Sequence, residues 1–236
     1  MHHWWKFSDE DVAMALRYFQ QAIKTESTYA PAHAGLALTY VSAGSWVGCM
    51  DAREAMPRGK AAARTAIELD PMLSDAYVAL GYIRLFFDWD WNGAERDFKK
   101  AIAINSRSVL ALDSYPSLLA PRGDIAQAVA LYNEALNLDP LSAVLHNDLA
   151  WAYWVGRQYD QAFSLYDRAL ELDPKLDGCL RNRSMTHAFR GDFNKAMADA
   201  AKALEVQPAS LWNIAVKGWL HGYTNNPAGA VDILRV

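Results

Sequence analysis

The segment 88–93 has the residue types most suggestive of chemistry in this chain. It consists of DWDWNG, which matches the D-x-D-x-N-G first half of a calcium-binding loop. The twelfth position of such a loop requires a glutamate that binds the ion with both oxygens, and here that position is Lys99. We therefore interpret the two aspartates as turn formers and helix caps, and we expect Trp89 and Trp91 to pack against neighbouring residues.

The remaining chemistry-capable residues do not form a recognisable reactive group. The six histidines are scattered and lack the helical spacing of metal ligands. The sequence contains no glycine-rich phosphate loop, no G-x-S-x-G, no C-x-x-C and no H-E-x-x-H. No nucleophile is paired with a base in a recognisable motif. We therefore expect no enzyme activity, no metal and no cofactor.

The composition disfavours two classes of partner. The 236 residues are 52% hydrophobic and have a formal net charge of −4, with both signs scattered along the chain. Nucleic acids and acidic membrane surfaces attract basic patches, so we expect neither as a partner. No stretch approaches the roughly 20 apolar residues of a membrane span. The N-terminus lacks a secretory signal, and we expect a cytoplasmic protein.

A six-residue ending recurs along the chain and divides it into units. Each copy closes a pair of helical patterns, as in 143–174, where apolar residues recur at three- and four-residue steps on both sides of a turn at Gly156 and Arg157. The last copies follow one another at steps of 34 residues. The copies are AIKTES at 22–27, AIELDP at 66–71, AIAINS at 101–106, ALNLDP at 135–140, ALELDP at 169–174 and ALEVQP at 203–208.

A 34-residue period built from helix–turn–helix is the signature of the tetratricopeptide repeat, and the chain resembles that family over essentially its whole length. The resemblance implies an all-α, right-handed superhelical solenoid of antiparallel helix pairs. Cys49 and Cys179 would then lie four repeats apart, too far to form a disulfide, which fits a reducing compartment. The expected single array over 1–236 consists of 1–29 as a partial repeat, 30–73 with a long connector, 74–108, 109–142, 143–176, 177–210 and a partial repeat at 211–236.

Two repeats depart from the family pattern. The connector 41–56 has ten extra residues, and we expect Asp51 and Glu54 to cap a short helical turn before Pro57 opens the second helix of that repeat. Pro116 falls in the middle of a first helix, where a proline removes a backbone hydrogen bond. We therefore predict a kink or break near 113–116. The second helix of that repeat is expected to be regular over 125–138.

Both ends of the array are expected to be incomplete. Residues 1–7 have the pattern of the end of a helix, and Ser8 is expected to cap the next helix. This pattern predicts that the chain is cut from a longer parent within a repeat. Asn226 and Pro227 are expected to cap and open a last helix. No polar capping helix follows, so its apolar face would be covered by missing sequence or by another copy of the chain.

In the resembled family the first helices line a concave surface, and four positions on each helix face the ligand. The lysine and asparagine of the family members that clamp acidic chaperone tails are absent at these positions. Aromatic residues stand there instead, and they either anchor a partner or merely fill the inner curve of the superhelix. The candidate partner-binding residues are Tyr82, Asn147, Trp151, Trp154, Arg181, Asn182, Met185, Trp212 and Trp219.

One arginine next to these positions is expected to have a structural role. Asn182, Arg183 and Ser184 closely resemble the Asn-Arg-Gly variant of the family. Its arginine is expected to bury its aliphatic stem and keep its charged head in water.

These patterns support three hypotheses. The first is a protein-interaction scaffold that holds an extended or helical segment of a partner in the groove. The second concerns a parent protein, because 4–12, the connector 41–56 and 87–102 resemble the C-terminal arrays of bacterial signalling proteins with a class III nucleotide cyclase, a winged-helix regulator or a Ser/Thr kinase. The third is self-association, as a homodimer, through the uncapped terminal helices.

Overall fold

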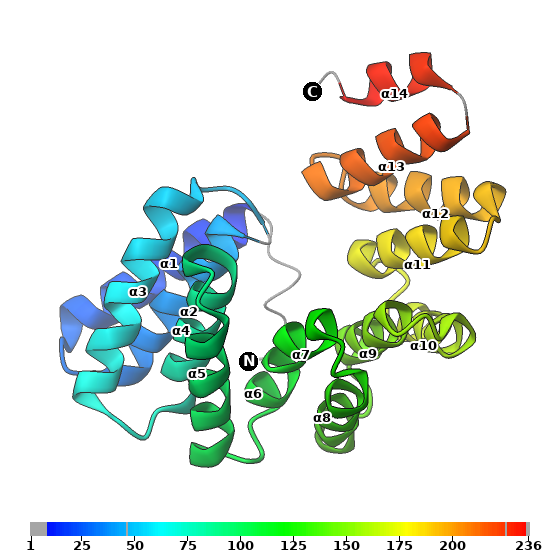
Figure 1. The fold of residues 1–236 in the computed structure, drawn as a ribbon. Coiled ribbons are helices and arrows are strands. Elements are labelled where there is room, and N and C mark those ends of the chain that lie inside the picture. Colours follow the sequence, from blue (N-terminus) through cyan, green and yellow to red (C-terminus); the bar gives the residue numbers. More distant parts are fainter. Residues whose placement is uncertain (1–8, 46, 225, 235–236) are drawn as a thin grey trace. The chain divides into compact units, whose positions relative to one another are not determined.

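The chain folds almost entirely into α-helices. The computed structural model describes residues 9–45, 47–224 and 226–234, and no β-strand occurs among them (Figure 1). The interpretation of residues 1–8 as a helix end and its cap lies outside the described residues. Two compact units divide the chain, residues 1–138 and residues 139–236. None of the described helices combines the length and the apolar character needed to cross a membrane.

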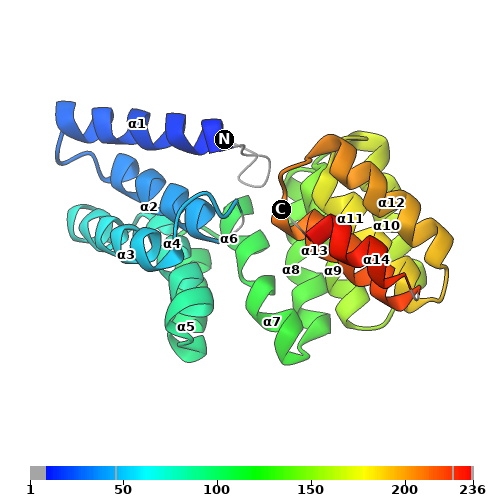
Figure 2. The ribbon, with the colours of Figure 1, turned by 90° about the horizontal axis from the view of Figure 1, so that it is seen from above.

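The first unit is a series of packed helix pairs. Helix α2 packs against α3, α4 against α5 and α7 against α8, while α1 lies along α2 (Figures 1 and 2). The helices are α1 (Asp9–Thr25), α2 (Ala30–Gly44), α3 (Ala52–Leu69), α4 (Ser74–Ile83), the π-helix η1 (Arg84–Asp88), α5 (Trp91–Ile104), α6 (Val109–Ser114), α7 (Pro116–Arg122) and α8 (Ile125–Leu138). Gly81 lets α4 approach α5 closely, because a Cβ there would lie 2.5 Å from the ring of Phe98. The prediction of a regular helix over 125–138 is confirmed.

The second unit contains three further helix pairs. They are α9 (Ala143–Val155) with α10 (Tyr159–Leu172), α11 (Asp177–Phe189) with α12 (Phe193–Val206), and α13 (Leu211–Tyr223) with α14 (Pro227–Leu234). The first helices of the three pairs, α9, α11 and α13, also contact one another in that order. Asn226 accepts a hydrogen bond from the Gly229 backbone at 3.0 Å, so the expected cap of α14 is confirmed.

The 34-residue period is visible in the backbone. The second helices α5, α8, α10, α12 and α14 begin at 91, 125, 159, 193 and 227. Two residues before four of these starts, the chain adopts a left-handed conformation, at Trp89, Gly123, Arg157 and Gly191. The repeat 74–108 has one residue more than the repeats that follow it, and the chain accommodates the extra residue before this turn as the π-helix η1. Each hairpin therefore turns at the same position of the repeat.

The long connector differs from its prediction. Asp51 caps a helix as expected, since its side chain accepts a hydrogen bond from the Arg53 backbone at 2.8 Å. That helix is α3 itself, which begins at Ala52, so the prediction that Pro57 opens it is wrong. The extra turn forms because it buries Ala55 and Met56 in the core. Pro57 is tolerated one turn further along the helix.

The predicted break near Pro116 is confirmed. The first helix of this repeat is divided into α6 and α7, which meet at Tyr115. Glu95 of α5 accepts hydrogen bonds from residues at both ends of α7, from Tyr115 Oη at 3.1 Å and from Arg122 Nη1 at 2.7 Å. Hydrogen bonds from Lys99 and Arg122 lower the pKa of the Glu95 carboxyl to about 2. One carboxylate thus holds the broken helix against its neighbour.

The segment 88–93 is a turn and a helix cap. Asp90 accepts a hydrogen bond from the Gly93 backbone at 2.8 Å and caps α5, as predicted, while Asp88 forms an ion pair with Lys60. The prediction that the two tryptophans pack is wrong, because Trp89 is 74% exposed and Trp91 is 38% exposed. Trp89 lies at the left-handed turn position before α5. Within the described ranges, no three His, Cys, Asp or Glu side chains are grouped so as to hold a metal ion.

Candidate functional site

The candidate site lies on the first helices of the second unit. Ser142 and Ser210 cap α9 and α13 by accepting hydrogen bonds from backbone N–H groups of their first turns. These helices repeat every 34 residues, so Trp151, Met185 and Trp219 occupy equivalent places on α9, α11 and α13. Side chains along this face therefore line up from one helix to the next.

Five aromatic rings form a continuous chain of contacts near the C-terminal ends of the first helices and the start of α12, and we call it the aromatic ladder. Its members are Trp154, Phe189, Phe193, Trp219 and Tyr223. Phe189 is central, with its ring centroid 5.5 Å from that of Trp154 and 6.1 Å from that of Trp219. Tyr223 lies 4.7 Å from Trp219 and 6.0 Å from Phe193.

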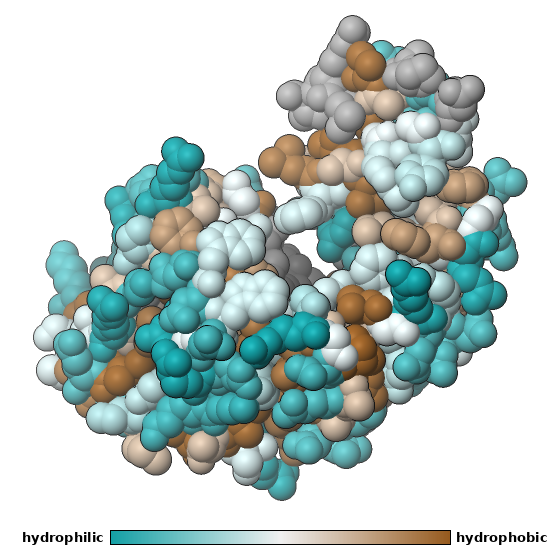
Figure 3. Space-filling view, in the orientation of Figure 1, coloured by the Kyte–Doolittle hydropathy of each residue, from teal (hydrophilic) through white to brown (hydrophobic). Residues whose placement is uncertain are grey.

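The aromatic ladder is open to solvent over much of its length. Phe189 is 56% exposed and Tyr223 is 64% exposed. In Figure 3 apolar and pale surface is visible over α13, whereas hydrophilic surface predominates over α3 and α5 of the other unit. Exposed phenylalanine and tryptophan on adjacent helices leave apolar area in contact with water.

Polar side chains occupy the same first helices about two turns nearer their N-termini, and we call them the polar row: Asn147, Arg181, Asn182 and Asn213. Asn182 donates a hydrogen bond from Nδ2 to Asn147 Oδ1 at 3.1 Å, which joins α11 to α9. Asn213 joins α13 to α11, because its Nδ2 donates to Asp177 Oδ2 at 3.0 Å and its Oδ1 accepts from Arg181 Nη1 at 3.4 Å. Burial lowers the pKa of Arg181, with the Asp177 charge acting in the opposite direction.

All but one of the predicted site residues belong to the second unit. Asn147, Arg181 and Asn182 belong to the polar row, and Trp154 and Trp219 both contact Phe189. Trp151 and Met185 are partly buried on the same face, and Trp212 is 60% exposed on the first turn of α13.

Two predicted site residues are buried. Asn147 is 8% exposed and its amide is hydrogen-bonded to Asp148 and Asn182, so the prediction that it faces a partner does not fit its burial.

Tyr82 is the second buried residue. It belongs to the first unit and is 1% exposed, and its ring stacks on Phe86 and meets the edge of Phe98. Close packing of α4 on α5 encloses this ring, so the prediction that Tyr82 faces a partner does not fit its burial.

Four residues of this surface were missed by the sequence analysis: Phe189, Phe193, Tyr223 and Asn213. Phe189 and Tyr223 lie 34 residues apart, one place beyond the family's ligand-facing positions, and this spacing is the signal that identifies them. Asn213 stands where the equivalent residues of the earlier repeats are Leu145 and Cys179. A buried asparagine at an apolar position is a sign of a hydrogen-bond network.

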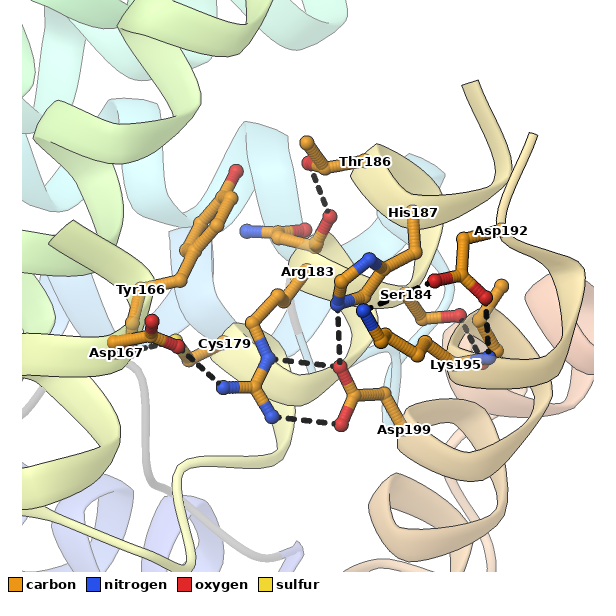
Figure 4. Close-up of polar contacts among 12 residues, drawn as sticks. Tyr166, Asp167, Cys179, Arg183, Ser184, Thr186, His187, Asp192, Lys195 and Asp199 are labelled. Carbon is orange, nitrogen blue, oxygen red and sulfur yellow. Dashed lines mark hydrogen bonds and ion pairs between the residues drawn. The ribbon is translucent and has the colours of Figure 1, made fainter. Parts of the chain in front are cut away.

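Arg183 lies on the same helix but belongs to the interior of the helix pairs. Its guanidinium donates to both carboxylate oxygens of Asp199, each at 2.8 Å, and to Asp167 at 2.7 Å (Figure 4). The prediction of a structural arginine with its head in water is therefore wrong in its second part, because two carboxylates bind the head. These ion pairs raise the pKa of Arg183. The ring of His187 lies beside Asp199, and burial lowers the pKa of this histidine.

The arrangement is suited to non-covalent recognition. The aromatic ladder provides apolar contact area, and Arg181 of the polar row provides guanidinium donors about two turns from Phe189 on the same helix. Exposed aromatic rings beside hydrogen-bond donors are the usual composition of a protein-binding surface.

Comparison with known proteins supports the repeat assignment. A family model described as tetratricopeptide repeat matches residues 120–178. A search of curated protein sequences gave no significant match.

Similar solved structures cover nearly the whole chain. PilF of Pseudomonas aeruginosa aligns with 86% of this chain and 88% of its own, at 18% identity and a TM-score of 0.62. PilW, described as a widely conserved type IV pilus biogenesis factor, aligns over 86% and 90% of the two chains, at 16% identity and a TM-score of 0.68. A chain of the APC/C hetero-tetramer Cut9–Hcn1 aligns with 89% of this chain and 40% of its own, at 17% identity and a TM-score of 0.68. Identities this low indicate a shared fold.

Proposed function

We propose that this chain, whose fold is that of a tetratricopeptide solenoid, is a non-catalytic protein-interaction module that holds a segment of a partner against the aromatic ladder. The observation that carries the proposal is the exposed ring contact between Phe189 and Trp219 on adjacent first helices. Aromatic side chains contribute large contact area and lose few rotamers on binding, so they dominate the energy of many interfaces. PilW is described as a type IV pilus biogenesis factor and Cut9–Hcn1 as a hetero-tetramer, which fits a role in holding other proteins.

The proposal is tested by selecting binding peptides and then removing the central ring. Random displayed peptides of about 12 residues, which span roughly 40 Å when extended, are selected on the purified chain. The affinity of the selected peptides is measured for the wild type and for Phe189→Ser. We expect a loss of about ten-fold or more, because an interface anchor is removed.

A matched control tests whether removing any exposed apolar side chain of the unit weakens peptide binding, or only removal of a ring of the aromatic ladder. Leu141 is 69% exposed in the same unit and lies outside the aromatic ladder, so Leu141→Ser is expected to retain peptide affinity. Equal binding by folded Phe189→Ser and wild type would place the partner surface elsewhere. Failure of the wild type to select any peptide would refute the proposal.

We infer further that the module serves a larger bacterial signalling protein in the cytoplasm. The support is the similarity of 4–12, 41–56 and 87–102 to the C-terminal arrays of such proteins. The coding sequence upstream of Met1 in the source genome tests this inference. A continuous reading frame that encodes a cyclase, a winged-helix domain or a kinase is expected, and any other preceding domain contradicts it.

Self-association is the second candidate function, and exposed apolar residues on the last helix pair favour it. Leu211 and Trp212 at the start of α13 and Val231 on α14 are all exposed. If these residues form a homodimer interface, sedimentation velocity will give a dimer mass that Leu211→Glu converts to the monomer. A monomer at high wild-type concentration would exclude this function.

A further inference from the structure

Two arginines on α11 have opposite surroundings, although they are two residues apart. Arg183 makes three hydrogen bonds to carboxylates. Arg181 makes one, at 3.4 Å, to the neutral amide of Asn213. Among the described residues, no carboxylate lies within ion-pair distance of Arg181. A guanidinium has five N–H donors, so most of the donors of Arg181 remain available to a ligand.

The nearby acidic groups do not pair with this charge directly. Asp177 accepts a hydrogen bond from Asn213, and Asp148 accepts one from Asn147 at 2.8 Å. Both carboxylates raise the pKa of Arg181, but the burial of the side chain outweighs them. A partly buried cation that lacks direct pairing is unfavourable, and an incoming anion would relieve it.

The surroundings of Arg181 also distinguish it from the other arginines of the second unit. Arg168 pairs with Glu171 and Arg190 pairs with Asp160, both near the surface, while Arg157 is exposed at a turn. Arg181 alone among the arginines of this unit lies in the polar row, within the described residues. Its charge is therefore placed where a partner on the first helices would meet it.

Arg181, Met185 and Phe189 follow one another at four-residue steps along α11. At 1.5 Å per residue, the guanidinium and the centre of the aromatic ladder are separated by about 12 Å along the helix. An extended segment covers that distance with about three to four residues. A bound segment can therefore contact both at once.

We propose that the partner segment carries a carboxylate that pairs with Arg181, three to four residues from a bulky apolar side chain that binds the aromatic ladder. This inference rests on the proposed function and specifies its ligand. The carboxylate belongs to an aspartate, a glutamate or a chain terminus, since a guanidinium binds all three through the same paired hydrogen bonds. This proposed site has one guanidinium among amide side chains. It therefore differs from the clamp of lysine and asparagine with which some family members bind acidic chaperone tails.

The test uses the displayed peptides of about 12 residues, now compared between the wild type, Arg181→Met and the control Arg168→Met. Arg168→Met removes the same charge from an exposed pair outside the polar row. We expect peptides selected on the wild type and on Arg168→Met to be enriched in Asp or Glu at three to four residues from Leu, Phe or Trp. The enrichment is expected to disappear on Arg181→Met.

A double-mutant cycle gives the decisive measurement. Replacing the acid of a selected peptide by its amide is expected to weaken wild-type binding about ten-fold, and to have no further effect on Arg181→Met. Arg181→Lys, which keeps the charge, is expected to retain part of the affinity and guards against a folding defect in Arg181→Met. Synthetic peptides with free and amidated C-termini show whether the carboxylate is a side chain or a chain terminus.

The outcomes separate the two proposals. Peptides that bind through Phe189 without any acidic preference would overturn this inference and leave the interaction module intact. Equal loss for the acid and amide peptides on Arg181→Met would also overturn it, because the arginine would then have only a structural role. Failure to select any peptide would overturn both.

Discussion

Asp97 in the first unit and Asp199 in the second occupy the same position of the 34-residue repeat, on α5 and α12. Both are almost fully buried and both meet an arginine. Asp199 receives two hydrogen bonds from Arg183, whereas Asp97 meets Arg84 through one contact at 3.2 Å. Burial raises the pKa of Asp97 to about 6, with Arg84 opposing it.

This difference shows that the position of a buried carboxylate in the repeat does not determine how well an arginine pairs with it. The period sets where each carboxylate lies, but the arginines come from different positions of their repeats and approach with different geometry. A planar guanidinium that binds both carboxylate oxygens compensates for burial far better than one that reaches a single oxygen. A carboxylate at this repeat position can therefore stabilise one unit, while the equivalent carboxylate makes the stability of the other unit depend on pH.

The largest predicted effect comes from breaking the better pair. Arg183→Met leaves Asp199 buried without its bidentate partner. We expect the free energy of unfolding to fall by about 2–3 kcal/mol, somewhat below the range for fully buried pairs because Arg183 keeps some contact with water. Urea unfolding followed by circular dichroism measures the loss.

Two variants complete that measurement. Arg168→Met removes an exposed pair and is expected to change the stability by less than about 0.5 kcal/mol. Arg84→Met removes the single contact to Asp97 and is expected to cost less than Arg183→Met. A larger loss from Arg84→Met would reverse the order of the two pairs and contradict the comparison.

The second prediction concerns pH and tests the poorer pair. The pKa of Asp97 is raised from its ordinary value of 3.8 to about 6, so the folded state holds this proton more tightly than the unfolded state. The resulting stabilisation is complete below pH 3.8 and is lost as the pH rises through 6. After a discount for solvent screening, the loss is about 1–2 kcal/mol.

Asp97→Asn removes this titration. Unfolding free energies of the wild type and the variant are compared from pH 4 to pH 7. The wild type is expected to lose stability relative to Asp97→Asn across this interval. Parallel curves would show that Arg84 compensates for the charge as fully as Arg183 does for Asp199.

The smallest predicted effect uses the left-handed turn position that both units share. Trp89 and Arg157 adopt φ values of 57° and 59° there, whereas Gly123 and Gly191 occupy the equivalent places. A side chain in this conformation costs about 1–2 kcal/mol, part of which is offset by the entropy of an unfolded glycine. Trp89→Gly and Arg157→Gly are each expected to stabilise the chain by about 0.5–1 kcal/mol.

Thermal and urea unfolding measure this gain. The reverse change, Gly123→Ala, is expected to destabilise the chain by a similar amount, because alanine is strained at positive φ. Destabilisation by Trp89→Gly would mean that the exposed indole contributes a native contact that offsets its backbone strain.

Much of the fold follows from local sequence rules. The recurring endings predicted the helix pairs, and the break at Pro116, the caps at Asp51, Asp90 and Asn226 and the helix over 125–138 are all confirmed. Proline removes a backbone donor and a capping side chain supplies an acceptor, and these effects act within a few residues. Such features depend on neighbours in sequence, which a sequence displays directly.

The candidate site was only partly predictable, because the exposure of its side chains depends on contacts between residues that are distant in sequence. The family positions identified Trp154, Trp219 and Arg181, but they missed Phe189 and included Tyr82, which the packing of α4 on α5 encloses. Exposure depends on which ring of one helix meets which residue of the next. One extra residue in a helix, or a glycine at the contact, changes which side chains pack against one another.

The sequence by itself determined the period, the all-helical class and the places where helices begin, turn and break, because hydrophobic spacing and backbone chemistry act locally. Only the tertiary structure decided that Arg183 binds two carboxylates while Arg181 donates to the amide of Asn213, and that the rings from Trp154 to Tyr223 contact one another in a partly exposed chain. Ion pairing and burial are set by groups that are distant in sequence and meet only when the helices pack.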